Sequence, residues 1–490
     1  MSIQTPDWVK HAVFYQIFPD RFARTAHHAK SAAMSVPVED WTTPPTPFGY
    51  KGGDLWGIIE HLDYIQDLGV TAIYLNPIFQ SACNHRYHTH DYYTVDPLLG
   101  GNEAFQDFLN AAHARGLKVV LDGVFNHASR GFFFFNDILE NGPNSPWVDW
   151  FTIEGWPLAA YDGDKPANYL CWAENRALPK INHDNAQARE YIMRVAEHWI
   201  RVGIDGWRLD VANEIEVEGF WQEFRDRIKA INPEAYIVAE IWEDSRSWLD
   251  GTQFDGVTNY LFTEPALAFG VGDRVQIEYV ERPNYTPYPA IDAHEYALRI
   301  ERLLQMYDWN IQLTQLNLLD SHDTARIFTV AGGDQDSPDA VALAVPRIHL
   351  AVLLMMTFPG APCVYYGDEV GLASGSEDPS YRYTFPAEAD WNQDILKFYK
   401  ALIQLRHDHP ALRTGTYKTV CADGYLYGFT RQLETQTMLV LVNAGATTAG
   451  GSLFVPATNP KIKYGPGQCE WVDGQVKISL PPYTGLVVEL

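Results

Sequence analysis

Short apolar runs alternate with amphipathic stretches along most of the chain. Within the runs, apolar and polar residues do not alternate, which predicts strands buried on both faces rather than on one. Eight runs stand out: AVFYQIFP (12–19), TAIYLNP (71–77), LKVVLDGVF (117–125), DGWRLDVA (205–212), AYIVAEI (235–241), FDGVTNY (254–260), TQLNLLD (314–320) and APCVYYG (361–367).

The stretches between these runs have helical spacing. In residues 101–116 and 185–203, apolar residues recur at intervals of three and four, which is the spacing of one helix face. Buried strands that alternate with helices indicate a parallel sheet. Eight such units predict an α/β fold, a closed (β/α)₈ TIM barrel.

Two regions depart from this alternation. Residues 128–187 are aromatic and lack regular spacing, which predicts a small domain inserted after the third strand. After residues 396–412 the pattern changes to short strands separated by turn residues, which is typical of an antiparallel β domain. We therefore predict a barrel of residues 1–127 and 188–411, an inserted domain of residues 128–187 and a C-terminal domain of residues 412–490.

The net charge limits the partners that the chain can bind, and the cysteine content indicates the compartment in which it works. The formal net charge of −26 would repel a phosphate backbone or an anionic membrane, so we expect no nucleic acid and no membrane partner. The five cysteines form no CxxC pair, which fits a reducing compartment. The N-terminus lacks the pattern of a signal peptide, and the longest apolar run (348–358) is too short to span a bilayer. We expect a cytoplasmic enzyme.

Polar residues follow several of the predicted strands at their C-terminal ends, where a barrel of this kind builds its active site. The residues in question are Asp122, Asn126, His127, Arg208, Asp210, Glu240, His322 and Asp323. A lone Arg-x-Asp in a strand is more often a structural ion pair, and a single Glu at a strand end is often a surface residue. That interpretation weakens here because it would have to hold independently for acids on several strands that end at one mouth.

The acids also differ in their sequence surroundings. Arg208 lies two residues from Asp210 on the same face of a strand and should keep that carboxylate ionised. Apolar neighbours such as Ala239 and Ile241 should favour the protonated form of Glu240. One ionised and one protonated carboxyl is the pair that cleaves glycosides, so we assign Asp210 as nucleophile and Glu240 as acid/base.

The segments DGVFNH, GWRLDVANE, AEIW and LLDSHD, in this order, resemble the four signature regions of the α-amylase family of glycoside hydrolases. The resemblance extends to residues 75–93 and 360–371, and it implies a C-terminal β-sandwich after the barrel. LPKIN (178–182) and VANE (211–214) resemble elements of the neopullulanase and cyclomaltodextrinase subfamily. The chain begins almost at its first strand, so we expect the short, debranching-enzyme-like form without an extra N-terminal domain.

The resemblance also implies residue roles. Asp323 would stabilise the transition state beside Asp210 and Glu240, and the mechanism would be retaining. Residues implied in substrate binding are Tyr87, Asp122, His127, Arg208, Trp242, His322, Asp378 and Arg382.

The expected substrates are α-glucan oligosaccharides: malto-oligosaccharides, branched dextrins, pullulan and cyclodextrins. We expect cleavage of α-1,4 bonds and, because the short form leaves the site uncovered, of α-1,6 bonds too. Glu243, where the subfamily commonly has His, should border the leaving-group side.

Three alternatives stay open: a trehalose- or isomaltulose-forming transglycosylase or isomerase, a strictly α-1,4-specific maltogenic amylase, and an inactive carbohydrate-binding protein. A homodimer also stays open.

Two features bear on metals. Relatives that bind calcium use an acidic, Asn-rich loop after FPDRF, whereas residues 18–33 lack those carboxylates, although GGD (52–54) is present. His85, His88 and His90 match no standard zinc spacing and more closely fit a sugar-binding rim. We therefore predict no metal site and no cofactor, with calcium as the open alternative.

Overall fold

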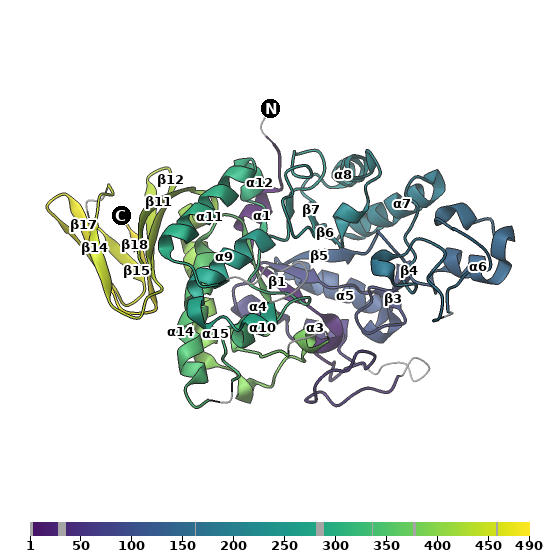
Figure 1. The fold of residues 1–490 in the computed structure, drawn as a ribbon, viewed down its shortest axis with the longest axis horizontal. Helices are drawn as coiled ribbons and strands as arrows, with labels where there is room; N and C mark the ends of the chain where they lie inside the picture. Colours follow the sequence, from purple (N-terminus) through teal and green to yellow (C-terminus); the bar gives the residue numbers. More distant parts are fainter. Residues whose placement is uncertain are drawn as a thin grey trace.

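The computed structural model describes residues 3–27, 36–161, 163–280, 289–335, 337–375, 379–456 and 459–490. The C-terminal strands lie at one end of the long axis of the molecule, and helix α6 lies at the other (Figure 1). The parallel strands lie between these two ends.

The eight parallel strands form a closed barrel, as predicted. They are β1 (Phe14–Ile17), β2 (Ala72–Leu75), β5 (Lys118–Gly123), β6 (Gly206–Leu209), β7 (Tyr236–Ala239), β8 (Gly256–Val257), β9 (Leu316–Asn317) and β10 (Ala361–Tyr365). The sheet order is β8-β7-β6-β5-β2-β1-β10-β9, and a parallel bridge between Thr258 and Leu316 joins its two edges. Each strand is shorter than its apolar run, and Asp122 and Arg208 are paired within the ladder whereas Asp210 and Glu240 follow the ends of their strands.

Helices surround the barrel. They are α1 (Asp7–His11), α2 (Pro19–Phe22), α3 (Leu55–Glu60), α4 (Leu62–Asp67), α5 (Gly101–Ala114), α7 (Ala186–Val202), α8 (Phe220–Ile231), α9 (Tyr260–Gly270), α10 (Ile277–Val280), α11 (Ala293–Met306), α12 (Trp309–Gln312), α13 (Ile327–Val330), α14 (Ala340–Thr357), α15 (Gln393–Asp408) and α16 (Pro410–Thr414). The two helices predicted from spacing, α5 and α7, are confirmed to within two residues at each end.

The segment after β5 contains little regular structure, as its sequence pattern indicates. It holds α6 (Phe133–Asn141), a 3₁₀ turn at Trp172–Glu174 and isolated bridges that include His127 with Lys180. A hairpin of β3 (Phe79–Ser81) and β4 (Thr89–Val95) follows β2. Both segments leave the C-terminal ends of barrel strands, so they can build walls for a site there.

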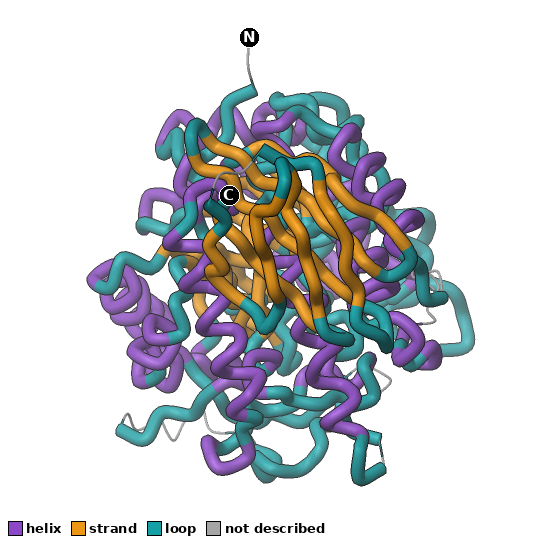
Figure 2. Tube along the Cα trace, turned by 90° about the vertical axis from the view of Figure 1, so that its left-hand side faces the viewer, coloured by secondary structure: helices purple, strands orange, loops and turns teal. Residues whose placement is uncertain are grey.

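The C-terminal strands form two antiparallel sheets. The larger has the order β11-β12-β13-β18-β15 and the smaller β14-β17-β16. Their bounds are β11 (Thr416–Asp423), β12 (Leu426–Leu433), β13 (Gln436–Asn443), β14 (Ala449–Leu453), β15 (Lys461–Tyr464), β16 (Gln468–Val472), β17 (Gln475–Leu480) and β18 (Thr484–Glu489). Figure 2 views these strands from their own end of the molecule. A buried cluster that includes Leu439, Leu441 and Ile478 contains residues of both sheets.

Helix α14 is longer than the apolar run at 348–358 that we judged too short for a membrane span. Its 18 residues have a mean hydropathy of 1.8, which is enough by length and composition to cross a bilayer, and 67% of them are buried. The helix contacts α9, α15 and β18, so its apolar surface faces protein on several sides. No other helix in the described ranges has this length and hydropathy.

Candidate active site

A cavity of about 510 Å³ lies at the C-terminal ends of the barrel strands. All three predicted catalytic acids line it: Asp210 directly follows β6, Glu240 directly follows β7, and Asp323 lies beyond β9. Tyr87 and Trp242, both predicted to bind sugar, line the same cavity. Residues from three strands thus meet as the barrel geometry predicts.

Arg208 forms ion pairs with three carboxyl groups of the site. Its guanidinium lies 3.0 Å from Asp122, 3.1 Å from Asp210 and 2.9 Å from Glu240. All four side chains are nearly inaccessible to solvent. One positive charge therefore serves three buried carboxyl groups, which fixes their positions but cannot neutralise all of them.

The expected division of charge between Asp210 and Glu240 needs correction. Burial and the neighbouring Glu240 raise the pKa of Asp210 well above its usual range, although Arg208 acts in the opposite direction. Arg208 thus does not by itself hold the pKa of Asp210 low. The sequence argument treated Arg208 and Asp210 as a pair and could not show that Arg208 also contacts Asp122 and Glu240.

Glu240 does not lie in the apolar environment that its sequence neighbours predict. Its Oε1 accepts hydrogen bonds from Trp242 Nε1 (3.1 Å), and its Oε2 accepts one from Val211 N (3.1 Å). Val211 has φ 39° and ψ 47°, a left-handed conformation that is strained for a β-branched residue. The strained residue is the one whose backbone N–H donates to Glu240, and such strain is common at active sites.

Asp323 is held at the other side of the cavity. Its carboxylate lies 3.2 Å from Arg382 Nη2 and 3.1 Å from His322 Nε2. Arg382 also donates to the backbone oxygen of His322 (3.0 Å). Burial lowers the pKa of His322 well below its usual range, so this imidazole is neutral and acts as a hydrogen-bonding group.

A chain of hydrogen bonds fixes Tyr87 at the cavity wall. Gln16 lies 2.9 Å from His322 Nδ1, and His322 Nε2 lies 2.5 Å from Tyr87 Oη. Tyr87 in turn donates to Asp122 Oδ2 at 2.9 Å and stacks on the His322 ring with an interplanar angle of 4°. The tyrosine ring is thereby held in one orientation, as a surface for a sugar requires.

His127 is the remaining predicted sugar ligand on β5's side of the cavity. Its ring stacks on Trp172 at 5.1 Å, and burial lowers its pKa to about 3, so it is neutral. Trp172 belongs to the segment inserted after β5, which therefore supplies part of the wall. No sequence motif points to Trp172, because only its tertiary contact with His127 brings it to the site.

Three predicted sugar ligands do not reach the cavity wall. Asp122, Arg208 and His322 are each at most 2% exposed and lie behind residues that line it. In this structure they position Tyr87, Asp210, Glu240 and Asp323. Their direct contact with sugar stays a prediction. Asp378 lies outside the described residues.

The two subfamily-like segments meet in space. Lys180 of LPKIN lies 3.0 Å from the carboxylate of Glu214 of VANE, and it also donates to the Glu214 backbone oxygen (3.2 Å). Glu214 lines the cavity, as does Glu243, which we expected on the leaving-group side. The inserted segment is thus tied to the loop that carries Asp210.

The histidines after β3 separate into two groups. His85 and His88 line the cavity, whereas His90 does not and packs against Gly131. The rim interpretation thus fits two of the three residues.

The described residues near GGD (52–54) do not fit a calcium ion. Both oxygens of Asp20 accept backbone N–H groups, from Lys51 and Gly52. Both oxygens of Asp54 likewise accept backbone N–H groups. The Lys51 ammonium donates to the backbone oxygens of Asp40 and Thr43. Calcium takes six to eight oxygen ligands, whereas the oxygens of Asp20 and Asp54 bind backbone N–H groups and the Lys51 ammonium brings a positive charge beside them.

Comparisons of the chain with a family model, with solved structures and with known proteins agree with this site. A family model described as "Alpha amylase, catalytic domain" matches residues 16–380. The solved structure of the debranching enzyme from Nostoc punctiforme is 59% identical, with both chains covered in full and a TM-score of 0.92. A cyclomaltodextrinase from a Bacillus species is 41% identical over 90% of this chain and 74% of that protein. Neopullulanase 2 from Thermoactinomyces vulgaris is 38% identical over 99% of this chain and 78% of that protein.

Proposed function

The chain belongs to the α-amylase family of glycoside hydrolases, and on this premise we propose that Asp210 and Glu240 carry its reaction. The observation that supports this most directly is the convergence of Asp210, Glu240 and Asp323 on one cavity, with Arg208 bridging the first two. The inactive-protein alternative loses its basis, since every acid that the reaction needs is present.

The reaction proceeds with retention in two steps. Glu240 protonates the glycosidic oxygen while Asp210 attacks the anomeric carbon, which gives a glycosyl enzyme and a free sugar. Glu240 then removes a proton from water, and the hydroxide oxygen replaces Asp210 at the anomeric carbon. Asp323, opposite this pair and held by Arg382, binds sugar hydroxyls and stabilises the positively charged transition state.

We assign the side chains around the acids to different parts of the bound glucan. Tyr87 and His127 support the sugar that is attacked, with Asp122, Arg208 and His322 positioned behind them. Arg382, with Asp378, holds the next sugar on the non-reducing side. Trp242, which donates to Glu240, faces the leaving group, and Glu243 lies next to it.

The substrates are α-glucans with α-1,4 bonds and with α-1,6 bonds. Cleavage of α-1,4 bonds is supported by the similarity to a cyclomaltodextrinase and a neopullulanase. Cleavage of α-1,6 bonds is supported by the 59% identity with a debranching enzyme over the whole chain.

The five cysteines are all free, which supports the cytoplasm as the location.

Replacement of Asp210 by Asn tests the assignment. The variant keeps the shape of the side chain and loses the nucleophile, so hydrolysis of maltotriose should fall by roughly 10⁴-fold or more while oligosaccharide binding persists. Glu243→Gln is the matched control, because it removes a carboxylate from the same cavity outside the reacting pair. Near-normal turnover by Asp210→Asn, measured as reducing sugar released, would contradict the proposal.

Product analysis decides the linkage. Pullulan and a branched dextrin are digested, and the products are separated by chromatography. Cleavage of the dextrin at its branch points releases its maltosyl and glucosyl branches. Cleavage of pullulan at α-1,6 bonds yields maltotriose. Panose as the only product from pullulan, with branch points left intact, indicates a strictly α-1,4-specific enzyme. Sugars with new linkages indicate a transglycosylase.

A further inference from the structure

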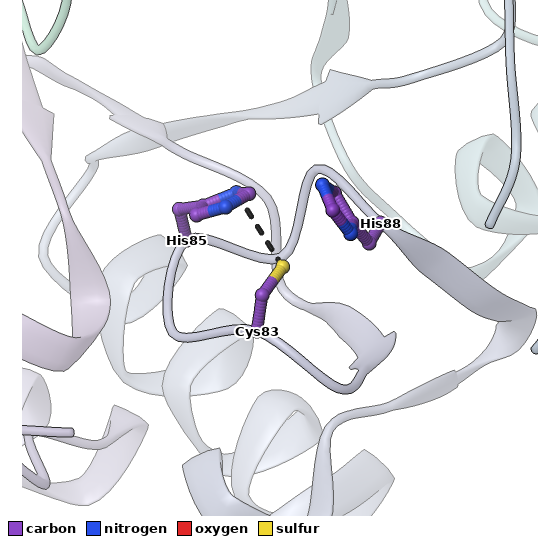
Figure 3. Close-up of side chains that lie close together, drawn as sticks. All are labelled: Cys83, His85 and His88. Carbon is purple, nitrogen blue, oxygen red and sulfur yellow. Dashed lines mark hydrogen bonds between the residues drawn. The ribbon is translucent and has the colours of Figure 1, made fainter. Parts of the chain in front are cut away.

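A cysteine and two histidines lie together at the edge of the active-site cavity. Cys83, His85 and His88 belong to the loop between β3 and β4, and one potential ligand atom from each lies within 4.8 Å of the other two. Figure 3 shows the Cys83 sulfur between the two imidazole rings. Among the described residues this is the group of His, Cys, Asp and Glu side chains whose spacing fits a metal ion.

The separations approach those of a zinc site. With Zn–S of about 2.3 Å and Zn–N of about 2.0 Å, sulfur and nitrogen ligands of a tetrahedral site lie about 3.5 Å apart. Cys83 Sγ lies 3.5 Å from His85 Nδ1. The ligand nitrogen of His88 lies within 4.8 Å of the other two ligand atoms, so it has to move by at most about 1.5 Å to reach tetrahedral spacing. Thiolate and imidazole together favour Zn²⁺ over Ca²⁺ or Mg²⁺.

Existing contacts hold these side chains in place. Ser81 Oγ donates to the His88 backbone oxygen (2.7 Å) and lies 3.2 Å from Cys83 Sγ, so it links Cys83 to the backbone of His88. The backbone N–H of Tyr87 donates to His85 Nδ1 (3.2 Å), and a metal ion bound at this nitrogen would replace that hydrogen bond. A hydrogen-bonded turn alone would account for Ser81 and Tyr87, but it would not require His88 to approach the sulfur.

The surrounding charges permit a cation. Two guanidiniums act on His85, and both have carboxylate partners: Arg382 pairs with Asp323 at 3.2 Å and Arg86 with Asp96 at 2.9 Å. Thiolate formation supplies one negative charge to the site, so a bound divalent cation adds a net charge of only +1.

We propose that Cys83, His85 and His88 form a binding site for Zn²⁺, and that bound Zn²⁺ inhibits the enzyme by occupying the rim of the glucan cavity. On binding, a zinc–sulfur bond forms, the Cys83 thiol releases its proton to solvent, and both imidazoles bind through nitrogen lone pairs. Inhibition follows because His85 and His88 line the cavity and turn towards the ion instead of the sugar. The inhibition rests on the proposed hydrolase function, whereas the binding does not.

Binding is measured first, on the full chain without substrate. Titration with ZnCl₂ in a calorimeter should give one ion per chain, and Co²⁺ in its place should give a thiolate-to-cobalt charge-transfer band in the near ultraviolet. Cys83→Ser should weaken zinc binding by at least about tenfold, since even changes outside the ligand shell cost about 10- to 100-fold. Cys469→Ser, another half-buried cysteine, and His90→Asn, the third histidine of the segment, are matched controls.

Inhibition is measured second, with maltotriose as substrate. Each variant's rate in ZnCl₂ is divided by its own rate in EDTA, so that any effect on basal activity cancels. Wild type and both controls should be inhibited reversibly, and Cys83→Ser should need at least about tenfold more zinc. Equal zinc binding by Cys83→Ser and wild type, or no cobalt band, would overturn the site. Binding without inhibition would overturn the second half of the proposal, and absence of hydrolysis in EDTA would overturn the proposed function instead.

Discussion

At the residue scale, the site is organised around Arg208. Its guanidinium contacts Asp122, Asp210 and Glu240, so the two carboxyls that we propose to react share a single cation. A substitution that removes it would leave three buried carboxyls without a counter-charge, which is far costlier than the loss of a surface ion pair. The proton affinity of Asp210 therefore depends on Glu240 as well as on Arg208.

This coupling predicts a pH shift in Glu240→Gln. Asp210 must be ionised to attack, so activity is lost as the pH falls through its pKa. Glu240 helps to raise that pKa, so its replacement by Gln should move the acid-side inflection of kcat/KM to lower pH. α-Maltosyl fluoride is the substrate for the measurement, because fluoride leaves without a proton from the acid.

Glu243→Gln serves as the control for this profile. Glu243 lies at the exposed edge of the cavity and is not among the groups that shift the pKa of Asp210. Its variant should keep the wild-type acid-side inflection. An unchanged inflection in Glu240→Gln, or one moved to higher pH, would show that Glu240 does not raise the pKa of Asp210.

At the scale of elements, local sequence decides where the barrel helices begin. Asn185 precedes α7, and its Oδ1 accepts hydrogen bonds from Gln187 N (3.0 Å) and Ala188 N (3.1 Å). Asn392 caps α15 in the same way, with both distances at 3.1 Å. Such caps satisfy backbone N–H groups that a helix cannot pair internally.

Loss of either cap should cost stability and leave the chemistry intact. Asn185→Ala and Asn392→Ala should each lower the free energy of unfolding by about 1 kcal/mol, measured by urea denaturation. The two variants can be compared because their helices lie differently along the chain. Helix α7 is followed by β6 and Asp210, whereas α15 is followed by the C-terminal strands. A large loss of kcat in Asn185→Ala alone would mean that the start of α7 also positions Asp210.

At the scale of the whole molecule, the barrel and the C-terminal strands share one core. Phe429, Val440 and Val487 belong to the same buried cluster as the barrel strands. Arg431 of β12, fully buried, donates to the backbone oxygens of Thr357 (2.6 Å), at the end of α14, and Leu412 (2.8 Å). The two parts should therefore unfold together, in a single transition.

Arg431→Met tests this coupling. The substitution leaves several buried carbonyl oxygens without donors, so the free energy of unfolding should fall by about 3 kcal/mol. Calorimetry should still show one transition, at a lower temperature. Arg194→Met, which removes a mostly exposed arginine, should change the transition little. A separate early transition in Arg431→Met would show that the C-terminal strands fold independently.

The sequence alone was sufficient for the fold and for the convergence of the three acids that we propose as catalytic. Buried strands need continuous apolar runs and helices need a three- and four-residue spacing, so both leave patterns in the chain. The polar residues that interrupt those runs had to lie at the strand ends, which placed Asp210, Glu240 and Asp323 together. Each of these inferences depends only on neighbours along the chain and on the symmetry of a barrel.

Only the tertiary structure decided how charge and contacts are distributed within the site. The sharing of Arg208 among three carboxyls, the stacking of Trp172 on His127 and the meeting of Lys180 with Glu214 all join residues from separate segments. Burial then set the direction in which the pKa of Asp210 moves. Desolvation and electrostatic coupling depend on distance through space, and the order of residues along the chain does not encode that distance.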